Sequence, residues 1–177
     1  KTRLKDLLNK EERSFITLHM LTNILDEVSN INNDFKITLW IYPHFKDNLF
    51  NDIKKKYKIN IRQQKGSSLC ERMNNCLLLE SSKHEKTILI GSDIPSLTKG
   101  TIMNAKYALL KKDVVIGPSA DGGFYLIGIK GHYEDLIDCM KPMDIQNVKN
   151  NISSRSLDLE LLTELKDIDR PEDLLVI

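Results

Sequence analysis

The chain has 177 residues, of which 41% are hydrophobic, a length and composition typical of one domain with its own buried core. Lys plus Arg number 26 and Asp plus Glu number 25, so the charge gives no electrostatic reason to expect a polyanionic partner. No apolar stretch approaches the roughly 18 residues that a membrane-spanning helix needs. We therefore expect a single domain over residues 1–177, and we disfavour nucleic-acid binding and membrane insertion.

The first half of the chain alternates between helical and strand-like patterns. Capping boxes at Asn9-Lys10-Glu11-Glu12 and Ser68-Leu69-Cys70-Glu71 mark the starts of two helices, and the second places Arg72 in a first helical turn. Apolar spacing predicts the other boundaries. The expected elements are a helix over 10–29, a strand over 35–42, a helix over 47–56, a strand over 59–63 and a helix from 69.

The second half continues the alternation, which predicts a mostly parallel sheet. Thr98 is expected to cap a helix, and Asp169 is expected to cap a short last helix with Pro171 in its first turn. The expected elements are a central strand over 87–91, a helix over 98–110, strands over 113–117 and 124–129, helices over 133–140 and 144–152, and a strand over 157–161.

The three cysteines are odd in number and have no Cys-x-x-Cys spacing, which predicts a reducing, cytoplasmic environment. Cys70 and Cys76 fall in a predicted helix, where we expect small apolar packing rather than a reactive or ligating role. The chain begins Lys1-Thr2-Arg3-Leu4, without the leader of a signal peptide, and we expect an upstream segment to be missing.

The segment Gly91-Ser92-Asp93-Ile94-Pro95 follows an apolar, β-branched run at the expected carboxyl end of a buried strand. Ligands bind α/β sheets in the crevice beyond such strand ends. A carboxylate there could hold Mg²⁺ or Mn²⁺, which take oxygen ligands and bind diphosphate groups. The alternative is that Asp93 accepts backbone N–H groups within the turn before Pro95.

The segment Asp121-Gly122-Gly123 follows the next expected strand. Two glycines would let the backbone approach a ligand closely, and Asp121 could bind a sugar or nucleotide hydroxyl. The alternative is a plain hairpin turn.

Several basic side chains could neutralise a diphosphate, although each could equally be a surface charge. They are Lys1, Arg3, Arg62 and Arg72. Gly66-Ser67-Ser68, at a helix start, also offers backbone N–H groups to an anion. Neither a P-loop motif nor Gly-x-Gly-x-x-Gly occurs, which argues against a P-loop enzyme or a dinucleotide-binding dehydrogenase.

Five segments together resemble the radical-SAM/selenodomain-associated transferases, some of which are described as arsenosugar-biosynthesis glycosyltransferases. They are Lys1-Thr2-Arg3-Leu4, the stretch 66–73 with Glu71-Arg72-Met73, the stretch 91–98, the stretch 113–128 and the stretch 167–174. The resemblance implies an α/β GT-A fold, a Rossmann-like three-layer sandwich for nucleotide-diphospho-sugars, whose first strand would lie upstream of Lys1.

The resemblance also implies roles for individual residues. Asp93 matches the position expected to hold Mg²⁺ or Mn²⁺. Asp121, Gly122 and Gly123 match the sugar or acceptor loop, with Asp121 as a candidate base. The expected nucleotide and diphosphate ligands are Lys1, Arg3, Arg72 and Ser92.

These assignments lead to a metal-dependent glycosyltransferase that moves a sugar from a nucleotide-diphospho-sugar donor to a small-molecule acceptor. The alternative enzyme is a nucleotidyltransferase, because guanylyltransferases of the phospholactate and molybdopterin types share the fold. A non-catalytic module that binds sugar nucleotides is the alternative from another class. A shared fold does not choose among them.

Overall fold

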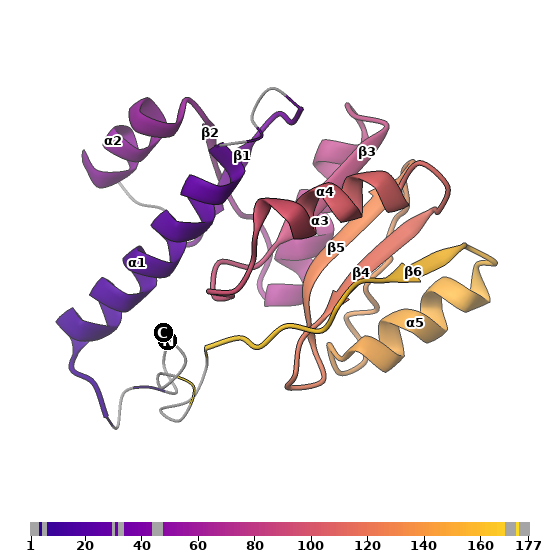
Figure 1. The fold of residues 1–177 in the computed structure, drawn as a ribbon. Helices are drawn as coiled ribbons and strands as arrows, with labels where there is room; N and C mark the ends of the chain where they lie inside the picture. The colour runs from indigo at the N-terminus through magenta and orange to yellow at the C-terminus, as the bar shows by residue number, and fades with distance from the viewer. Residues whose placement is uncertain are drawn as a thin grey trace.

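The computed structural model describes residues 4, 7–29, 31, 34–43, 48–168 and 173, and its helices and strands follow the alternation that the sequence predicts (Figure 1). In chain order they are α1 Lys10–Ser29, β1 Thr38–Ile41, α2 Asn48–Tyr57, β2 Asn60–Gln63, α3 Leu69–Ser81, β3 Lys86–Ile90, α4 Lys99–Ala108, β4 Val114–Pro118, β5 Phe124–Lys130, α5 Ile145–Ser154 and β6 Leu159–Leu161.

The strands form two sheets. β1 and β2 pair in parallel, and the larger sheet has the order β3-β5-β4-β6. β5 pairs antiparallel with both β3 and β4, whereas β6 pairs parallel with β4. It follows that β3, β4 and β6 run in one direction and only β5 runs in the other, as expected for a mostly parallel sheet with one returning strand.

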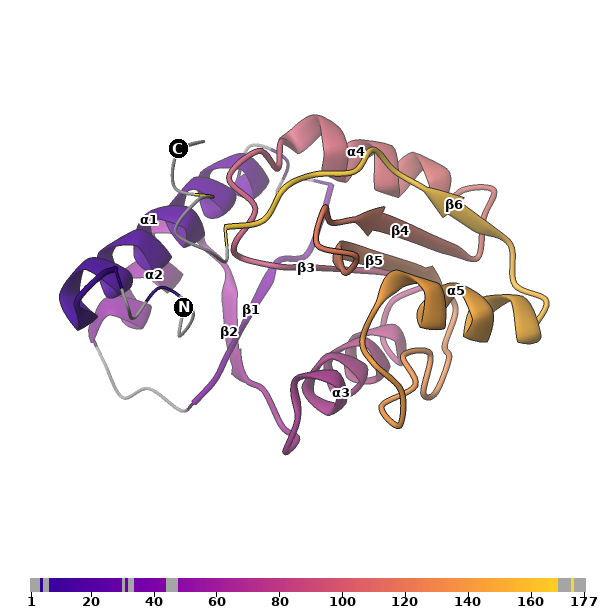
Figure 2. The ribbon, with the colours of Figure 1, turned by 90° about the horizontal axis from the view of Figure 1, so that it is seen from below.

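Helices cover both faces of the larger sheet, with α4 on one face and α3 and α5 on the other (Figure 2). The residues of β4 alternate between two cores because successive side chains of a strand point to opposite faces. Val115 packs in the core that includes α1 and α4, whereas Val114 and Ile116 pack with α3 and α5. All three are 0% exposed, so β4 is at the centre of the three-layer sandwich.

Most helix boundaries agree with the capping signals in the sequence. At the start of α1, the Asn9 side chain accepts from Glu12 N at 2.9 Å, and the Glu12 carboxylate accepts from Asn9 N at 2.8 Å. Thr98 caps α4 by accepting from Thr101 N at 3.3 Å, and Asp144 caps α5 by accepting from Asn147 N at 2.8 Å. These side chains satisfy N–H groups that have no partner within the helix.

Two expectations differ from the structure. Residues 133–140 form turns rather than a helix, and Asp135 has a positive φ of 48° that an α-helix excludes. β3 lies at the edge of the larger sheet in the described part of the chain, not at its centre. The expected last helix falls on residues 169–172, outside the described residues, and the expected strand upstream of Lys1 stays a prediction. Among the described helices, none is long and apolar enough to cross a membrane.

Candidate functional site at the carboxyl ends of the strands

Two loops singled out in the sequence lie at one edge of the sheet. Asp93 follows the carboxyl end of β3, and Asp121 follows the carboxyl end of β4, which runs in the same direction. β5 starts between them: Gly91 N donates to Tyr125 O at 2.8 Å, and Pro118 is in register with Phe124. The structure therefore brings the Asp93 and Asp121 loops together, as the sheet topology predicts.

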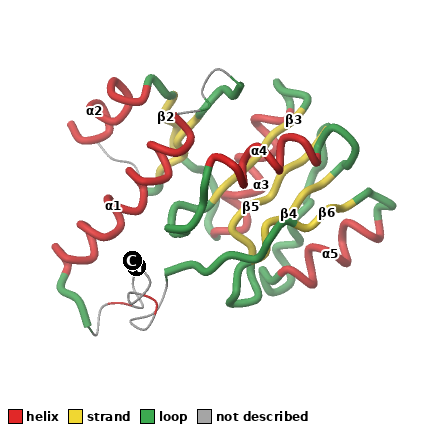
Figure 3. Tube along the Cα trace, in the orientation of Figure 1, coloured by secondary structure: helices red, strands yellow, loops and turns green. Residues whose placement is uncertain are grey.

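The segment after β6, residues 162–168, connects these two loops (Figure 3). Leu165 N donates to Pro118 O at 3.0 Å, and Ala120 N donates to Leu165 O at 3.0 Å. Further along, Ile168 N donates to Asp93 O at 3.0 Å. Ile168 is 1% exposed, so this contact is part of the packed fold. Asp167 directly precedes Ile168, so the hydrogen bond from Ile168 N to Asp93 O brings a second acidic residue close to the backbone of Asp93.

Asp93 has a local geometry that depends on Gly91. A Cβ on Gly91 would lie 3.0 Å from Asp93 Oδ1, so the glycine leaves room for the carboxylate to fold back over the strand end. Ser92, between them, is exposed. In the described part of the chain no three His, Cys, Asp or Glu side chains gather as a metal site. Mg²⁺ commonly needs only one or two carboxylates when substrate phosphates supply further oxygens. The expected role of Asp93 as the metal ligand stays a prediction.

Asp121 acts as a turn residue in the structure. Its Oδ1 accepts from Ser119 Oγ at 2.6 Å and from Gly123 N at 2.9 Å. Gly122 has a φ of +89°, and a Cβ on Gly123 would lie 3.1 Å from both Asp121 Oδ1 and Ser119 Oγ. Both glycines are thus explained by the turn itself. The expected roles of this loop in acceptor or sugar binding, and of Asp121 as a base, stay predictions.

The first turn of α3 reaches the same edge of the sheet, because a short turn connects α3 to β3 and the two run in opposite directions. Ser68 Oγ accepts from Glu71 N at 3.1 Å, while the Glu71 carboxylate accepts from Ser67 N at 2.8 Å and from Ser67 Oγ. These bonds from Ser67 lower the pKa of Glu71. Glu71 thus accepts the hydrogen bond of the Ser67 N–H group, which the sequence had suggested as a donor to an anion. Arg72 remains as the candidate anion-binding residue at this helix start.

Replacing Ser68 with alanine is expected to lower the free energy of unfolding by about 1 kcal/mol, because the Glu71 N–H group would lose its partner. Urea unfolding followed by circular dichroism measures the change. Ser154→Ala is the control, since the Ser154 hydroxyl donates to Asn151 O within α5 and caps no helix. Equal losses for the two variants would show that Ser68 contributes nothing as a cap.

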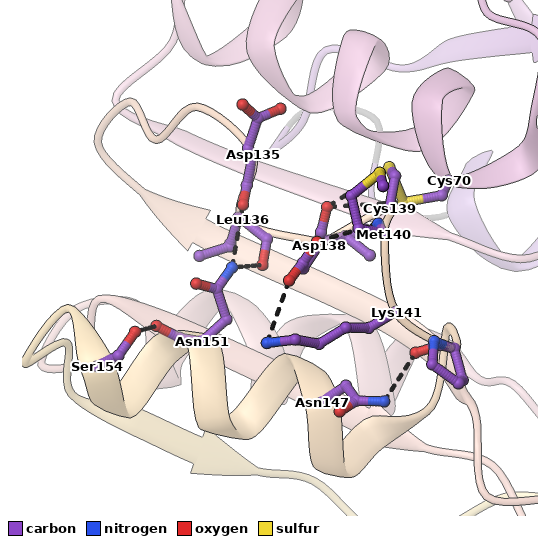
Figure 4. A network of polar contacts seen from close by, with 12 residues as sticks. Cys70, Asp135, Leu136, Asp138, Cys139, Met140, Lys141, Asn147, Asn151 and Ser154 are labelled. Atoms are coloured by element: carbon purple, nitrogen blue, oxygen red, sulfur yellow. Dashed lines mark hydrogen bonds and ion pairs between the residues drawn. A yellow bond between two sulfur atoms is a disulfide. The ribbon is translucent and has the colours of Figure 1, made fainter.

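A disulfide between Cys70 and Cys139 joins the first turn of α3 to the loop over residues 131–144 (Figure 4). The expectation that Cys70 serves only for apolar packing is therefore wrong. The partner was not evident from the sequence because the two cysteines are 69 residues apart. Cys76 follows the expectation: it is a free thiol, 3% exposed, and burial raises its pKa to about 12.

The 131–144 loop also lies beside the Asp121 turn, because Ile145 N donates to Gly122 O at 2.9 Å. Asn74 on α3 donates to Ile137 O at 2.7 Å and accepts from Ile137 N at 3.2 Å. From α5, Asn151 donates to Leu136 O at 2.8 Å, as Figure 4 shows. Hydrogen bonds thus attach the 131–144 loop to α3, to α5 and to the Asp121 turn.

Of the other predicted site residues, Lys1 and Arg3 lie outside the described residues. Leu4 of the same motif is described and is 0% exposed. Asp167 received no individual role from the sequence, although the stretch 167–174 contributed to the resemblance. The hydrogen bond from Ile168 N to Asp93 O shows that Asp167 lies near Asp93.

The chain matches one family model, which is described as "Uncharacterized protein conserved in bacteria (DUF2064)", over residues 27–143. It is also similar to 2-phospho-L-lactate guanylyltransferases of two Methanocaldococcus species. The protein of Methanocaldococcus vulcanius is 27% identical over 186 residues, covering 98% of this chain and 76% of the relative. The protein of Methanocaldococcus jannaschii is 28% identical over 188 residues, covering 98% and 75%.

Solved structures share the fold. A structure from Desulfovibrio desulfuricans G20, assigned as a nucleotide-diphospho-sugar transferase, has a TM-score of 0.86 at 24% identity and covers 99% of this chain and 78% of its own. The 4-diphosphocytidyl-2C-methyl-D-erythritol synthase of Anaerococcus prevotii has a TM-score of 0.64 at 16% identity, covering 89% and 86%. The predicted fold of nucleotide-diphospho-sugar transferases is confirmed, and so is the prediction of an enzyme of the transferase class.

Proposed function

The chain belongs to the DUF2064 family, and from this premise we propose that it is a nucleotidyltransferase. The substrates would be a nucleoside triphosphate and a small organic phosphate. A phosphate oxygen of the acceptor would attack the α-phosphorus of the nucleotide. The bond between the α-phosphorus and the bridging oxygen would break, and pyrophosphate would leave.

The similarity to two guanylyltransferases over 98% of this chain is the observation that carries the proposal. It favours nucleotidyl transfer over the glycosyl transfer that the sequence suggested first. The fold is compatible with this choice, because a 4-diphosphocytidyl-2C-methyl-D-erythritol synthase has it too. By analogy with the relatives, 2-phospho-L-lactate is the first acceptor to test.

The site residues would act mainly by binding and orienting the phosphate groups of the substrates. Asp93, with Asp167 beside it in the backbone, would hold Mg²⁺ or Mn²⁺ against the phosphates, and the bound ion would neutralise charge on the leaving pyrophosphate. Arg72 would donate to phosphate oxygens, and its planar guanidinium can bind two of them at once. Lys1, Arg3 and Ser92 would complete the phosphate site, and the Asp121 loop would border the acceptor.

Glycosyl transfer from a nucleotide-diphospho-sugar is the second candidate, which the likeness to the D. desulfuricans structure favours at the level of fold. Membership of the radical-SAM/selenodomain-associated transferases and a role in arsenosugar biosynthesis would belong to this candidate and stay predictions. A cytoplasmic location also stays a prediction.

The released product separates the two candidates. Purified protein with Mg²⁺ or Mn²⁺ is expected to release pyrophosphate from one of the four nucleoside triphosphates when 2-phospho-L-lactate or another small organic phosphate is added. A pyrophosphatase-coupled phosphate assay measures this, and reactions without acceptor are the control. Release of a nucleoside diphosphate from a sugar nucleotide, with no pyrophosphate from any triphosphate, would establish glycosyl transfer instead. Binding of sugar nucleotides without turnover of either donor would favour the binding module.

A further inference from the structure

Arg72 is held by an aromatic ring rather than by a carboxylate. Its Cζ lies 4.1 Å from the centroid of the Tyr42 ring, and Tyr42 directly follows the carboxyl end of β1. This is closer than Arg62 lies to Trp40, at 5.8 Å. A guanidinium over a ring face is attracted by the ring quadrupole, and its N–H groups remain in its own plane for other partners.

Arg72 forms no salt bridge with a described carboxylate, although its charge contributes to the lowered pKa of the neighbouring Glu71. Its neighbour Glu71 is engaged with Ser67 N and Oγ. Among the described residues, the Arg72 side chain makes one hydrogen bond, a long contact of 3.5 Å from Nη1 to Ser67 O. Nε is buried and has no partner. A buried donor atom without a partner is costly unless a ligand satisfies it.

We propose that Tyr42 is a positioning residue, which holds the Arg72 guanidinium ready for the phosphate groups of the nucleotide. The proposal rests on the proposed function, because it takes a nucleoside triphosphate as the ligand of Arg72. Stacking fixes the guanidinium without neutralising its charge, whereas an ion pair would fix it and neutralise it. An anion that arrives thus meets an ordered cation that is not engaged in a salt bridge with a described residue, and less conformational entropy is lost on binding.

The hydroxyl of Tyr42 is not needed for this role. It makes no hydrogen bond in the described part of the chain, whereas the ring face carries the contact. Tyr42→Phe therefore retains the stack and Tyr42→Ala removes it. Tyr107→Ala is a matched control, because Tyr107 on α4 is 56% exposed and Tyr42 is 54% exposed.

Calorimetric titration with GTP and with inorganic tripolyphosphate, both without divalent cations, measures the effect on binding. Tyr42→Ala is expected to weaken binding of both probes about three- to tenfold. Tyr42→Phe and Tyr107→Ala are expected to bind as the unchanged protein does. On an Arg72→Ala background, Tyr42→Ala is expected to have no further effect, because Tyr42 acts through Arg72. A loss of equal size on that background would overturn the proposal, since Tyr42 would then contact the nucleotide itself.

A second measurement does not depend on nucleotide binding. Labelling with phenylglyoxal, read by mass spectrometry, is expected to modify Arg72 faster in Tyr42→Ala than in Tyr42→Phe. Equal labelling would overturn the proposal whatever nucleotides do. Faster labelling with unchanged affinity for both probes would also overturn it. A protein that releases no pyrophosphate from any triphosphate would contradict the proposed function alone, while labelling and tripolyphosphate binding would still decide the role of Tyr42.

Discussion

Reduction of the Cys70–Cys139 disulfide is expected to lower the free energy of unfolding by about 4 kcal/mol. The two cysteines are 69 residues apart, so the bond closes a long loop in the unfolded chain. Closing a loop of about this length removes conformational entropy from the unfolded state that corresponds to about 4 kcal/mol at 25 °C. Urea unfolding with and without dithiothreitol measures the difference.

The folded structure around the bond is expected to change little on reduction, because other contacts hold the same loop. Asn74 bonds to both backbone groups of Ile137, and Arg155, the C-cap residue of α5, donates to Glu134 O at 2.7 Å and to Asp135 O at 3.0 Å. The loss of stability should therefore arise mainly in the unfolded ensemble. Near-ultraviolet circular dichroism of the reduced protein should match that of the oxidised protein.

Cys139→Ser gives the matched control. Cys139 is exposed, whereas Cys70 is 8% exposed, so serine at position 139 removes the bond without adding a buried hydroxyl. The variant should unfold at the midpoint of the reduced protein and should not respond to dithiothreitol. Thiol titration of the unfolded, oxidised protein should count only Cys76. Three free thiols before reduction, or a midpoint that dithiothreitol leaves unchanged, would contradict the disulfide.

The same loop shows where local sequence patterns stop predicting structure. Tyr133, Leu136, Ile137 and Met140 have the i, i+3, i+4, i+7 spacing of an amphipathic helix, yet Met140 is 94% exposed and the segment is not helical. Instead, Asn74 on α3 and Asn151 on α5 donate hydrogen bonds to backbone carbonyl groups of this segment. These side chains come from distant parts of the chain, so their competition with helical hydrogen bonding cannot be predicted from the local sequence.

The strand ends were predictable for a physical reason. Asp93 and Asp121 each follow an apolar run, and parallel strands place their carboxyl ends at one edge of a sheet, so the sequence was sufficient to bring both loops to one site. It could not place Asp167, whose position depends on the bond from Ile168 N to Asp93 O. It also could not anticipate that Glu71 would take the Ser67 N–H group.

Replacement of Asp93 with asparagine is expected to lower kcat/KM for pyrophosphate release by about 100-fold or more. The amide keeps the shape of the side chain but loses the negative charge that would bind Mg²⁺ or Mn²⁺ at the phosphates. Charge stabilisation by such an ion lowers the activation free energy by several kcal/mol. Each reduction of about 1.4 kcal/mol raises the rate tenfold. Raising the Mn²⁺ concentration should restore part of the activity.

Stability and binding measurements separate this role from a structural one. If Asp93 only ordered the turn before Pro95, asparagine would fill that role nearly as well, since Asn also accepts backbone N–H groups in turns. The thermal midpoint of Asp93→Asn should therefore stay close to that of the unchanged protein. Glu160→Gln is the matched control for loss of one charge, because Glu160 is exposed on β6.

Calorimetry of GTP binding gives the direct test of the metal role. In the unchanged protein and in Glu160→Gln, Mn²⁺ is expected to tighten GTP binding, whereas in Asp93→Asn it should tighten binding much less. Asp167→Asn should reduce the Mn²⁺ effect as well if both carboxylates approach the ion. Mn²⁺-dependent GTP binding that is unchanged in Asp93→Asn would remove Asp93 as the metal ligand.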